Sequence, residues 1–164
     1  MKIWDFNALD EATAQAGLEA CARIPDWAAA VVAGRPYADA PSLLAAADAL
    51  AAGWTDEQVT QALADHPRIG EKHEGEGVSA EHSAREQAGV DPADAALQRR
   101  LADGNRRYEE TFDRIYLVRA AGRSAAEILA LLEELLTNDP ATELRVTAGQ
   151  LREIAALRLA GWLA

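Results

Sequence analysis

The sequence has little cysteine and little positive charge. Cys21 is its one cysteine, so no disulfide can form within the chain, and a reducing cytoplasm is the expected compartment. Its 16 Lys and Arg residues are outnumbered by 27 Asp and Glu residues, which gives a net charge of −11. Nucleic acids require a basic face, so this balance argues against nucleic acid as the main partner. One or two buried arginines could still bind a small anion.

Long apolar segments and several common site motifs are also missing. No apolar run approaches the roughly 18 residues that cross a membrane, and the stretch Met1–Asp5 does not have the pattern of a signal peptide. There is no His-Glu-x-x-His, no cysteine pair and no Gly-x-Ser-x-Gly. The spacing of Gly70, Gly75 and Gly77 fits neither a P-loop nor a dinucleotide-binding loop. We therefore expect no membrane partner and no metal site.

The residues that are abundant favour helix. Hydrophobic residues make up 49% of the chain, and most of them are alanine and leucine. A chain of 164 residues without an internal repeat or a linker is expected to form one domain, residues 1–164. We predict an all-α fold, a compact and irregular bundle of about eight helices.

Local signals predict where these helices begin. Asn7 is expected to cap a first helix that runs to Ile24, with Gly17 as a weak point. Further starts are predicted at Pro25, Pro41, Ser79, Asp91-Pro92 and Asp139-Pro140, and at the capping boxes that begin with Thr55 and Ser124. The run from Ile115 to Val118 is β-branched and aromatic and has no helical period, so it is predicted to be extended or irregular.

A polar segment in the middle of the chain holds the groups best suited to acid–base chemistry. All three histidines, His66, His73 and His82, lie in it, together with several glutamates that include Glu71 and Glu86. Histidine titrates near neutral pH, which suits general acid–base catalysis. The alternative is a solvated loop that happens to contain histidines. A metal site built from these residues would lack any known zinc spacing.

Arg158 is the most informative single residue. At about 100° per residue, it falls on the same arc of the last helix as the apolar residues Leu151, Ile154, Ala155, Leu159 and Trp162. An arginine is rarely buried without a partner. Three interpretations stay open at this point: a side chain that extends to the surface, a structural ion pair, or a group that binds an anionic ligand.

Two other positions have the residue types of a site. His66 precedes Pro67, which fixes the local backbone, although a capping or surface histidine would look the same. Ser83, Glu86 and Gln87 are spaced at i, i+3 and i+4, so a helix would place them on one face. That face could bind a polar heterocycle through its hydroxyl, carboxylate and amide groups, or it could be an ordinary solvated face.

The order of these motifs resembles a known family. His66-Pro67-Arg68-Ile69-Gly70-Glu71 followed by Ser83-x-x-Glu86-Gln87-Ala88-Gly89 is similar to the signature of the OHCU decarboxylases of urate breakdown, where OHCU is 2-oxo-4-hydroxy-4-carboxy-5-ureidoimidazoline. Shorter similarities follow the same order along nearly the whole chain, at Arg35-Pro36-Tyr37, Asn105-x-x-Tyr108, Gly122-Arg123-Ser124 and Glu153–Leu159. Two positions depart from the family: Phe112-Asp113-Arg114 stands where Phe-Gly-Phe is frequent, and Arg119 stands where a small or apolar residue is common.

The resemblance implies an all-helical homodimer that converts OHCU to (S)-allantoin and CO2 without a cofactor. It implies catalytic roles for His66, Glu86 and Arg158. It further implies substrate contacts from Pro67, from Ser83, Ala84, Arg85, Glu86 and Gln87, and from the extended segment that contains Tyr116, Leu117, Val118, Arg119 and Ala120.

Two other functions remain possible on the sequence. One is a hydrolase in which His66 and Glu86 activate water against a purine-derived ring. The other is a helical interaction module whose acidic surface binds a basic partner. Arg158 argues against the module, because a scaffold has little reason to keep an arginine on an apolar face.

Overall fold

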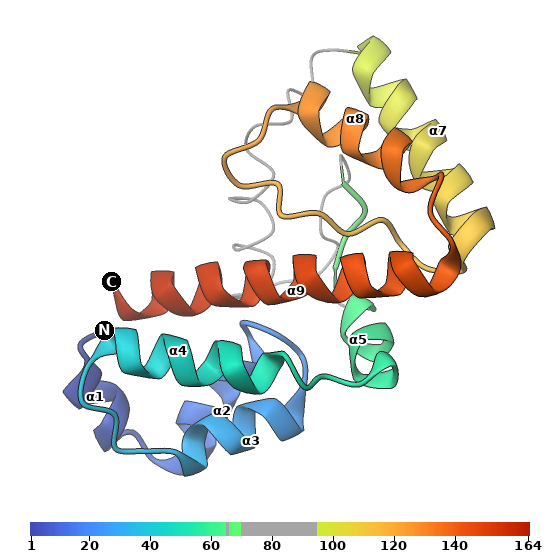
Figure 1. Ribbon diagram of the computed structural model, residues 1–164. Helices are drawn as coiled ribbons and strands as arrows, with labels where there is room; N and C mark the ends of the chain where they lie inside the picture. The colour runs from blue at the N-terminus through green and yellow to red at the C-terminus, as the bar shows by residue number, and fades with distance from the viewer. Residues whose placement is uncertain (65, 70–94) are drawn as a thin grey trace. The chain divides into compact units, whose positions relative to one another are not determined.

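The computed structural model describes residues 1–64, 66–69 and 95–164, and these residues form eight helices and no strand. With the labels of Figure 1, the helices are α1 (Ile3–Ala8), α2 (Glu11–Glu19), α3 (Pro25–Ala33), α4 (Ala40–Ala51), α5 (Asp56–Leu63), α7 (Ala95–Phe112), α8 (Ala125–Leu135) and α9 (Pro140–Leu163). The predicted all-α fold is confirmed. None of the helices in the described ranges is long and apolar enough to cross a membrane.

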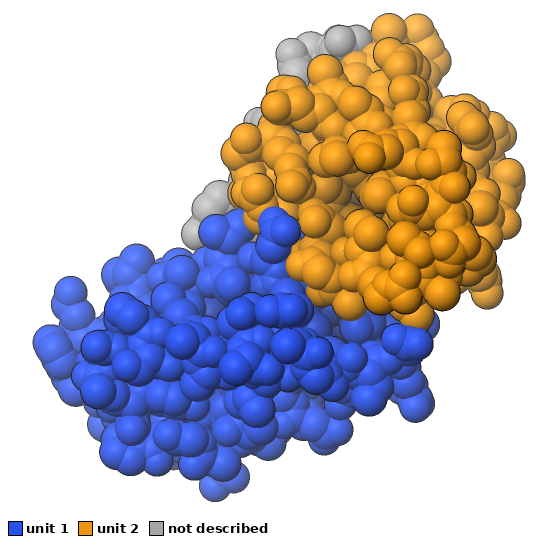
Figure 2. Space-filling view, viewed as in Figure 1, with its two compact units in different colours: residues 1–62, 151–164 blue, residues 63–150 orange. Residues whose placement is uncertain are grey.

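The chain divides into two compact units (Figure 2). Unit 1 comprises Met1–Ala62 and Leu151–Ala164, and unit 2 comprises Leu63–Gln150. Helix α9 belongs to unit 2 in its first part and to unit 1 in its last part. Both chain ends lie in unit 1, where the ammonium group of Met1 donates hydrogen bonds to the carbonyl oxygens of Trp162 and Ala164, each at 3.0 Å.

Most of the predicted helix starts are confirmed. Helix α3 begins at Pro25, and α9 begins at Pro140 after the capping residue Asp139, whose Oδ1 accepts the Thr142 N–H at 3.0 Å. Thr55 and Gln58 exchange the two hydrogen bonds of a capping box before α5, and Ser124 and Glu127 do the same before α8. Helix α4 begins at Ala40, one residue before the predicted Pro41, because Asp39 accepts the Ser42 N–H at 2.8 Å. The predicted starts at Ser79 and Asp91-Pro92 lie outside the described residues.

The prediction for the first helix was wrong. The chain forms two helices there, α1 and α2, and Asn7 lies inside α1. Asn7 does not cap, because its amide side chain pairs with the backbone of Tyr37: Nδ2 donates to the carbonyl oxygen at 2.8 Å and Oδ1 accepts the N–H at 3.0 Å. The capping residue of α2 is Asp10, whose carboxylate accepts the Thr13 N–H at 2.9 Å.

The core of unit 1 contains a close contact between α2 and the end of α9. A Cβ atom placed on Gly17 would lie 2.1 Å from Cη2 of Trp162, so the indole ring sits directly on the backbone of α2. The same ring packs edge-to-face on Phe6 at a centroid distance of 5.7 Å. Gly17 therefore provides space for an aromatic ring. The packing of this ring compensates for the low helix propensity of glycine.

The core of unit 2 forms where α7 packs against α8. Leu101, Tyr108 and Phe112 of α7 are buried in it, as are Ile128, Leu129 and Leu132 of α8. The two helices approach closely at Gly104, where a Cβ atom would lie 2.4 Å from Cδ2 of Leu132. Ile69, Tyr116, Val118 and Ala120 belong to the same cluster. The core therefore joins α7 and α8 to the loop after α5 and to the segment after α7.

Candidate functional site

The loop that contains His66 follows directly after α5. The His66 N–H donates to the carbonyl oxygen of Leu63 at 3.0 Å, which continues the last turn of the helix. The side chains of His66 and Pro67 are both half-buried, whereas Ile69 enters the core of unit 2 and is only 6% exposed. His66 thus has a backbone held by the end of α5 and is partly exposed, which is compatible with a role as an acid–base group.

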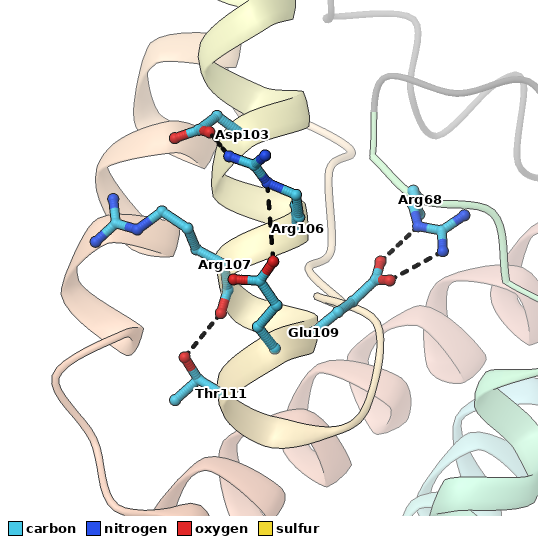
Figure 3. A network of polar contacts seen from close by, with 7 residues as sticks. Arg68, Asp103, Arg106, Arg107, Glu109 and Thr111 are labelled. Carbon is cyan, nitrogen blue, oxygen red and sulfur yellow. Dashed lines mark hydrogen bonds and ion pairs between the residues drawn. The ribbon is translucent and has the colours of Figure 1, made fainter.

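Helix α7 holds this loop at two points, and Figure 3 shows one of them. The Arg68 guanidinium forms a bidentate ion pair with the Glu109 carboxylate, in which Nη2 donates to Oε2 at 2.9 Å and Nε donates to Oε1. One turn earlier on α7, the buried Asn105 donates from Nδ2 to the carbonyl oxygen of Ile69 at 3.0 Å. Sequence reasoning missed both contacts, because their partners lie 41 and 36 residues apart in the chain.

The segment 115–120 is irregular, as predicted, and it is largely buried. The Tyr116 ring packs on Tyr108 at a centroid distance of 5.4 Å, and its hydroxyl donates to the carbonyl oxygen of Ile128 at 3.1 Å. Burial raises the pKa of the Tyr116 hydroxyl above its usual value. Leu117, Val118 and Ala120 are also buried, at 5 to 7% exposure. Side chains of this segment thus serve mainly to pack it into unit 2.

Among the described residues, the backbone of this segment is hydrogen-bonded at Arg119 but not at Leu117 and Val118. The Arg119 N–H donates to Oε1 of Gln150 at 2.9 Å, and Nη1 of Arg123 donates to the carbonyl oxygen of Arg119 at 2.9 Å. In the described structure, the backbone N–H and C=O groups of Leu117 and Val118 form no hydrogen bond. These groups can therefore offer donors and acceptors to a polar ligand.

Tyr108, which packs on Tyr116 of this segment, belongs to a buried polar network with Glu143 and Asn138. The Glu143 side chain, 1% exposed, accepts hydrogen bonds from the Tyr108 hydroxyl at 2.5 Å and from Nδ2 of Asn138 at 2.9 Å. Burial, and next the hydrogen bond to Glu143, raise the pKa of Tyr108 above its usual value. This network could not be predicted from the sequence, since a glutamate in the first turn of a helix is usually exposed.

Arg158 lies where the helical arc predicted. It is 6% exposed and shares its side of α9 with the buried residues Leu151, Ile154, Ala155 and Leu159. Glu153, which the arc placed outside, is exposed. The predicted place of Arg158 on the apolar side of the helix is confirmed. Arg158 belongs to unit 1, whereas the His66 loop belongs to unit 2.

The remaining predicted site residues lie outside the described residues. They are Ser83, Ala84, Arg85, Glu86 and Gln87, together with His73 and His82. Within the ranges that the structure describes, no group of three or more His, Cys, Asp or Glu side chains is placed to hold a metal ion. Cys21 is buried.

Comparisons with known sequences cover nearly the whole chain. The model of the OHCU decarboxylase family matches residues 7–160. The 2-oxo-4-hydroxy-4-carboxy-5-ureidoimidazoline decarboxylase of Amia calva is 32% identical over 142 residues, a match that covers 84% of this chain and 79% of that protein. The uric acid degradation bifunctional protein TTL of Arabidopsis thaliana is 36% identical over 104 residues, which are 61% of this chain. This chain spans only 32% of the length of that bifunctional protein.

Solved structures agree in fold. The crystal structure of an OHCU decarboxylase in the presence of (S)-allantoin superposes with a TM-score of 0.74 at 23% identity, over 88% of this chain and 95% of that chain. The crystal structure of an (S)-allantoin synthase gives a TM-score of 0.70 at 17% identity, over 98% of this chain and 54% of that chain. These two structures show a shared helical fold, and the sequence matches confirm the resemblance predicted from the motifs: the chain belongs to the OHCU decarboxylase family.

Proposed function

We propose that this chain decarboxylates OHCU to (S)-allantoin and CO2 in urate breakdown, and that it needs no cofactor. Membership of the family supports the enzyme class, a carboxy-lyase that acts on a carbon–carbon bond. The observation that carries the proposal furthest is the family match over residues 7–160. Arg158, buried on the apolar side of α9, has the planar guanidinium that binds carboxylates, and the substrate has a carboxylate.

The chemistry of the substrate explains why no cofactor is required. The carboxylate is attached to a carbon beside a C=N bond. When the bond to the carboxylate breaks, its electron pair moves into this C=N system, whose nitrogen gains a proton, and CO2 leaves. The substrate is thus its own electron sink, a task that other decarboxylases assign to a bound cofactor. The carbon that lost CO2 still bears its hydroxyl group, so the intermediate is an enol. This hydroxyl gives up its proton to become the carbonyl, and a proton is delivered to one face of the neighbouring carbon of the former C=N bond, which becomes the (S) centre.

Each candidate residue has a role suited to its chemistry. Arg158 holds the carboxylate or a carbonyl oxygen through the two-pronged geometry of its guanidinium. His66 transfers protons near neutral pH, and Glu86 orients His66 or binds ureido N–H groups. Ring recognition falls to Pro67, Ser83, Ala84, Arg85 and Gln87, and to the segment with Tyr116, Leu117, Val118, Arg119 and Ala120. In that segment the open backbone groups of Leu117 and Val118 are suited to the N–H and C=O groups of a ureide.

The setting of the enzyme is part of the proposal. The 164 residues act as one catalytic domain, which is supported by a family match that runs from residue 7 to residue 160. We propose that the protein is a homodimer and that it acts in the cytoplasm. Its binding partner there is the small-molecule substrate. The one cysteine of the chain suits a reducing compartment.

The test is to generate OHCU from urate with urate oxidase and the following hydrolase, and then to add this protein. CO2 release and the circular dichroism of the allantoin formed are followed with and without EDTA. We expect faster CO2 release, an excess of the (S) enantiomer and no effect of EDTA. CO2 release at the spontaneous rate would refute the proposal. Ring opening without CO2 would instead indicate a hydrolase.

A further inference from the structure

The ion pair between Arg68 and Glu109 connects α7 to the residue two places after His66 (Figure 3). It is bidentate, with Nη2 and Oε2 2.9 Å apart, and its side chains are 45% and 28% exposed. Partly exposed ion pairs contribute little to the stability of a fold, because solvent screens them. The pair therefore has its main effect on local geometry, and the local structure is the His66 loop.

Asn105 gives the loop a second attachment. Its Nδ2 donates to the carbonyl oxygen of Ile69 at 3.0 Å, and the residue is 3% exposed. Asn105 and Glu109 are spaced at i and i+4, so they share one face of α7. Two neighbouring loop residues are thereby held by one rigid helix. Between them and His66 stands Pro67, whose ring restricts the backbone, so the attachment fixes His66 as well.

We propose that Glu109 and Asn105 are positioning residues for His66, and that α7 is the element that holds the catalytic loop in place. This inference rests on the proposed function, because it gives His66 a part in the reaction. Small displacements of a catalytic group can lower turnover by as much as about a hundredfold. Removal of the Glu109 carboxylate should consequently reduce turnover much more than it reduces stability.

The chain offers a matched control on the same helix. Arg100 of α7 forms an ion pair with Glu133 of α8 at 2.9 Å, and its side chains are 63% and 54% exposed. Glu109 and Glu133 are both helical, and both pair with an arginine from another segment. The Glu133 pair joins two helices, however, and does not involve the His66 loop.

The experiment compares Glu109→Ala with Glu133→Ala in the full chain. Steady-state kinetics on OHCU give kcat and KM, denaturant melts give stability, and hydrogen–deuterium exchange follows the backbone from Leu63 to Ile69. For Glu109→Ala we expect kcat to fall about tenfold with KM within about threefold, and exchange of the loop to become faster. Glu109→Gln, which keeps one acceptor oxygen, should have an intermediate kcat. Glu133→Ala should keep both kcat and loop exchange within about twofold of wild type. The two alanine variants should unfold at the same denaturant concentration.

Loop exchange that is equally slow in the two alanine variants would overturn the inference, and so would faster exchange with an unchanged kcat. Equal losses of kcat in both variants would overturn it too, because they would indicate a general effect on folding. Failure of the proposed function is a separate result: wild type would then leave CO2 release from OHCU at its spontaneous rate, and His66 would have no reaction to be positioned for.

Discussion

The Tyr108 hydroxyl donates a 2.5 Å hydrogen bond to the Glu143 carboxylate in a fully buried part of unit 2. This bond joins α7 to the first turn of α9, and the Tyr108 ring also packs on Tyr116 of the segment 115–120. Because the Asn138 amide donates to the other carboxylate oxygen, the buried carboxylate has a donor on each side. A buried carboxylate satisfied in this way stabilises one arrangement of the chain around it.

Because of this bond, the stability of the fold should decrease at alkaline pH. Burial, and next the Glu143 hydrogen bond, raise the pKa of Tyr108 above its usual 10.0. The neutral hydroxyl is therefore favoured in the folded state, so its stabilisation is complete below about pH 10 and is lost as the pH rises toward the higher folded pKa. Above about pH 10, ionisation of Tyr108 should lower the free energy of unfolding by up to about 1.4 kcal/mol per pH unit. In urea melts between pH 8 and pH 12, Tyr108→Phe should show a shallower fall than wild type, and equal slopes would contradict this explanation.

Gly17 and Trp162 supply a prediction in unit 1. Glycine to alanine inside a helix usually stabilises by up to about 1 kcal/mol. At Gly17 the new Cβ atom would lie 2.1 Å from the Trp162 ring, so Gly17→Ala should instead destabilise by about 1–3 kcal/mol. Gly149→Ala is the control, because no atom lies within 4 Å of the added carbon. Thermal or urea melts should give opposite signs for the two variants, and a stabilising Gly17→Ala would mean that the ring moves aside at little cost.

The helix starts could be predicted from the sequence because each depends on neighbouring residues. Ser124 finds its partner in Glu127, three residues later, and Pro25 fixes its own backbone. Asn7 has the chemistry of a cap, but its amide pairs with Tyr37, 30 residues away. No local pattern distinguishes these two uses of the same side chain.

The candidate site shows the same division. Arg158 could be predicted to be buried because a helical arc is a property of adjacent turns. The attachment of the His66 loop to Asn105 and Glu109 could not, since each of these residues follows its partner in the loop by more than 30 residues. The predicted roles of His66 and Arg158 in catalysis stay predictions that the following variants test.

His66→Ala should lower kcat on OHCU by about 10²–10⁴-fold, the usual contribution of a general acid–base group. Stability should change little, because the side chain is half-buried on a loop and its backbone N–H bond to Leu63 is retained. Stopped-flow or continuous assays of CO2 release, beside urea melts of both proteins, measure the two effects separately. Near-normal turnover in a folded variant would remove His66 from the mechanism.

Arg158→Lys and Arg158→Met separate the charge of this residue from its shape. Lysine keeps the positive charge but loses the planar fork, so Arg158→Lys should still impair CO2 release strongly. Methionine suits the apolar face of α9, so Arg158→Met should abolish activity while the protein stays at least as stable as wild type, provided that the substrate is the main partner of the guanidinium. A structural ion pair predicts the opposite, a loss of about 3–5 kcal/mol, because a buried carboxylate would be left alone.

Arg152→Met is the control for these variants. Arg152 lies on the same helix but pairs near the surface with Asp48 at 2.9 Å, so its loss should cost no more than about 1 kcal/mol and leave turnover unchanged. Urea melts and OHCU assays of all four proteins then decide the role of Arg158. A substrate anchor requires that Arg158→Met be inactive and no less stable than Arg152→Met. A strongly destabilised Arg158→Met would assign the residue to the fold, and a stable, fully active one would leave the buried guanidinium without a part in the reaction.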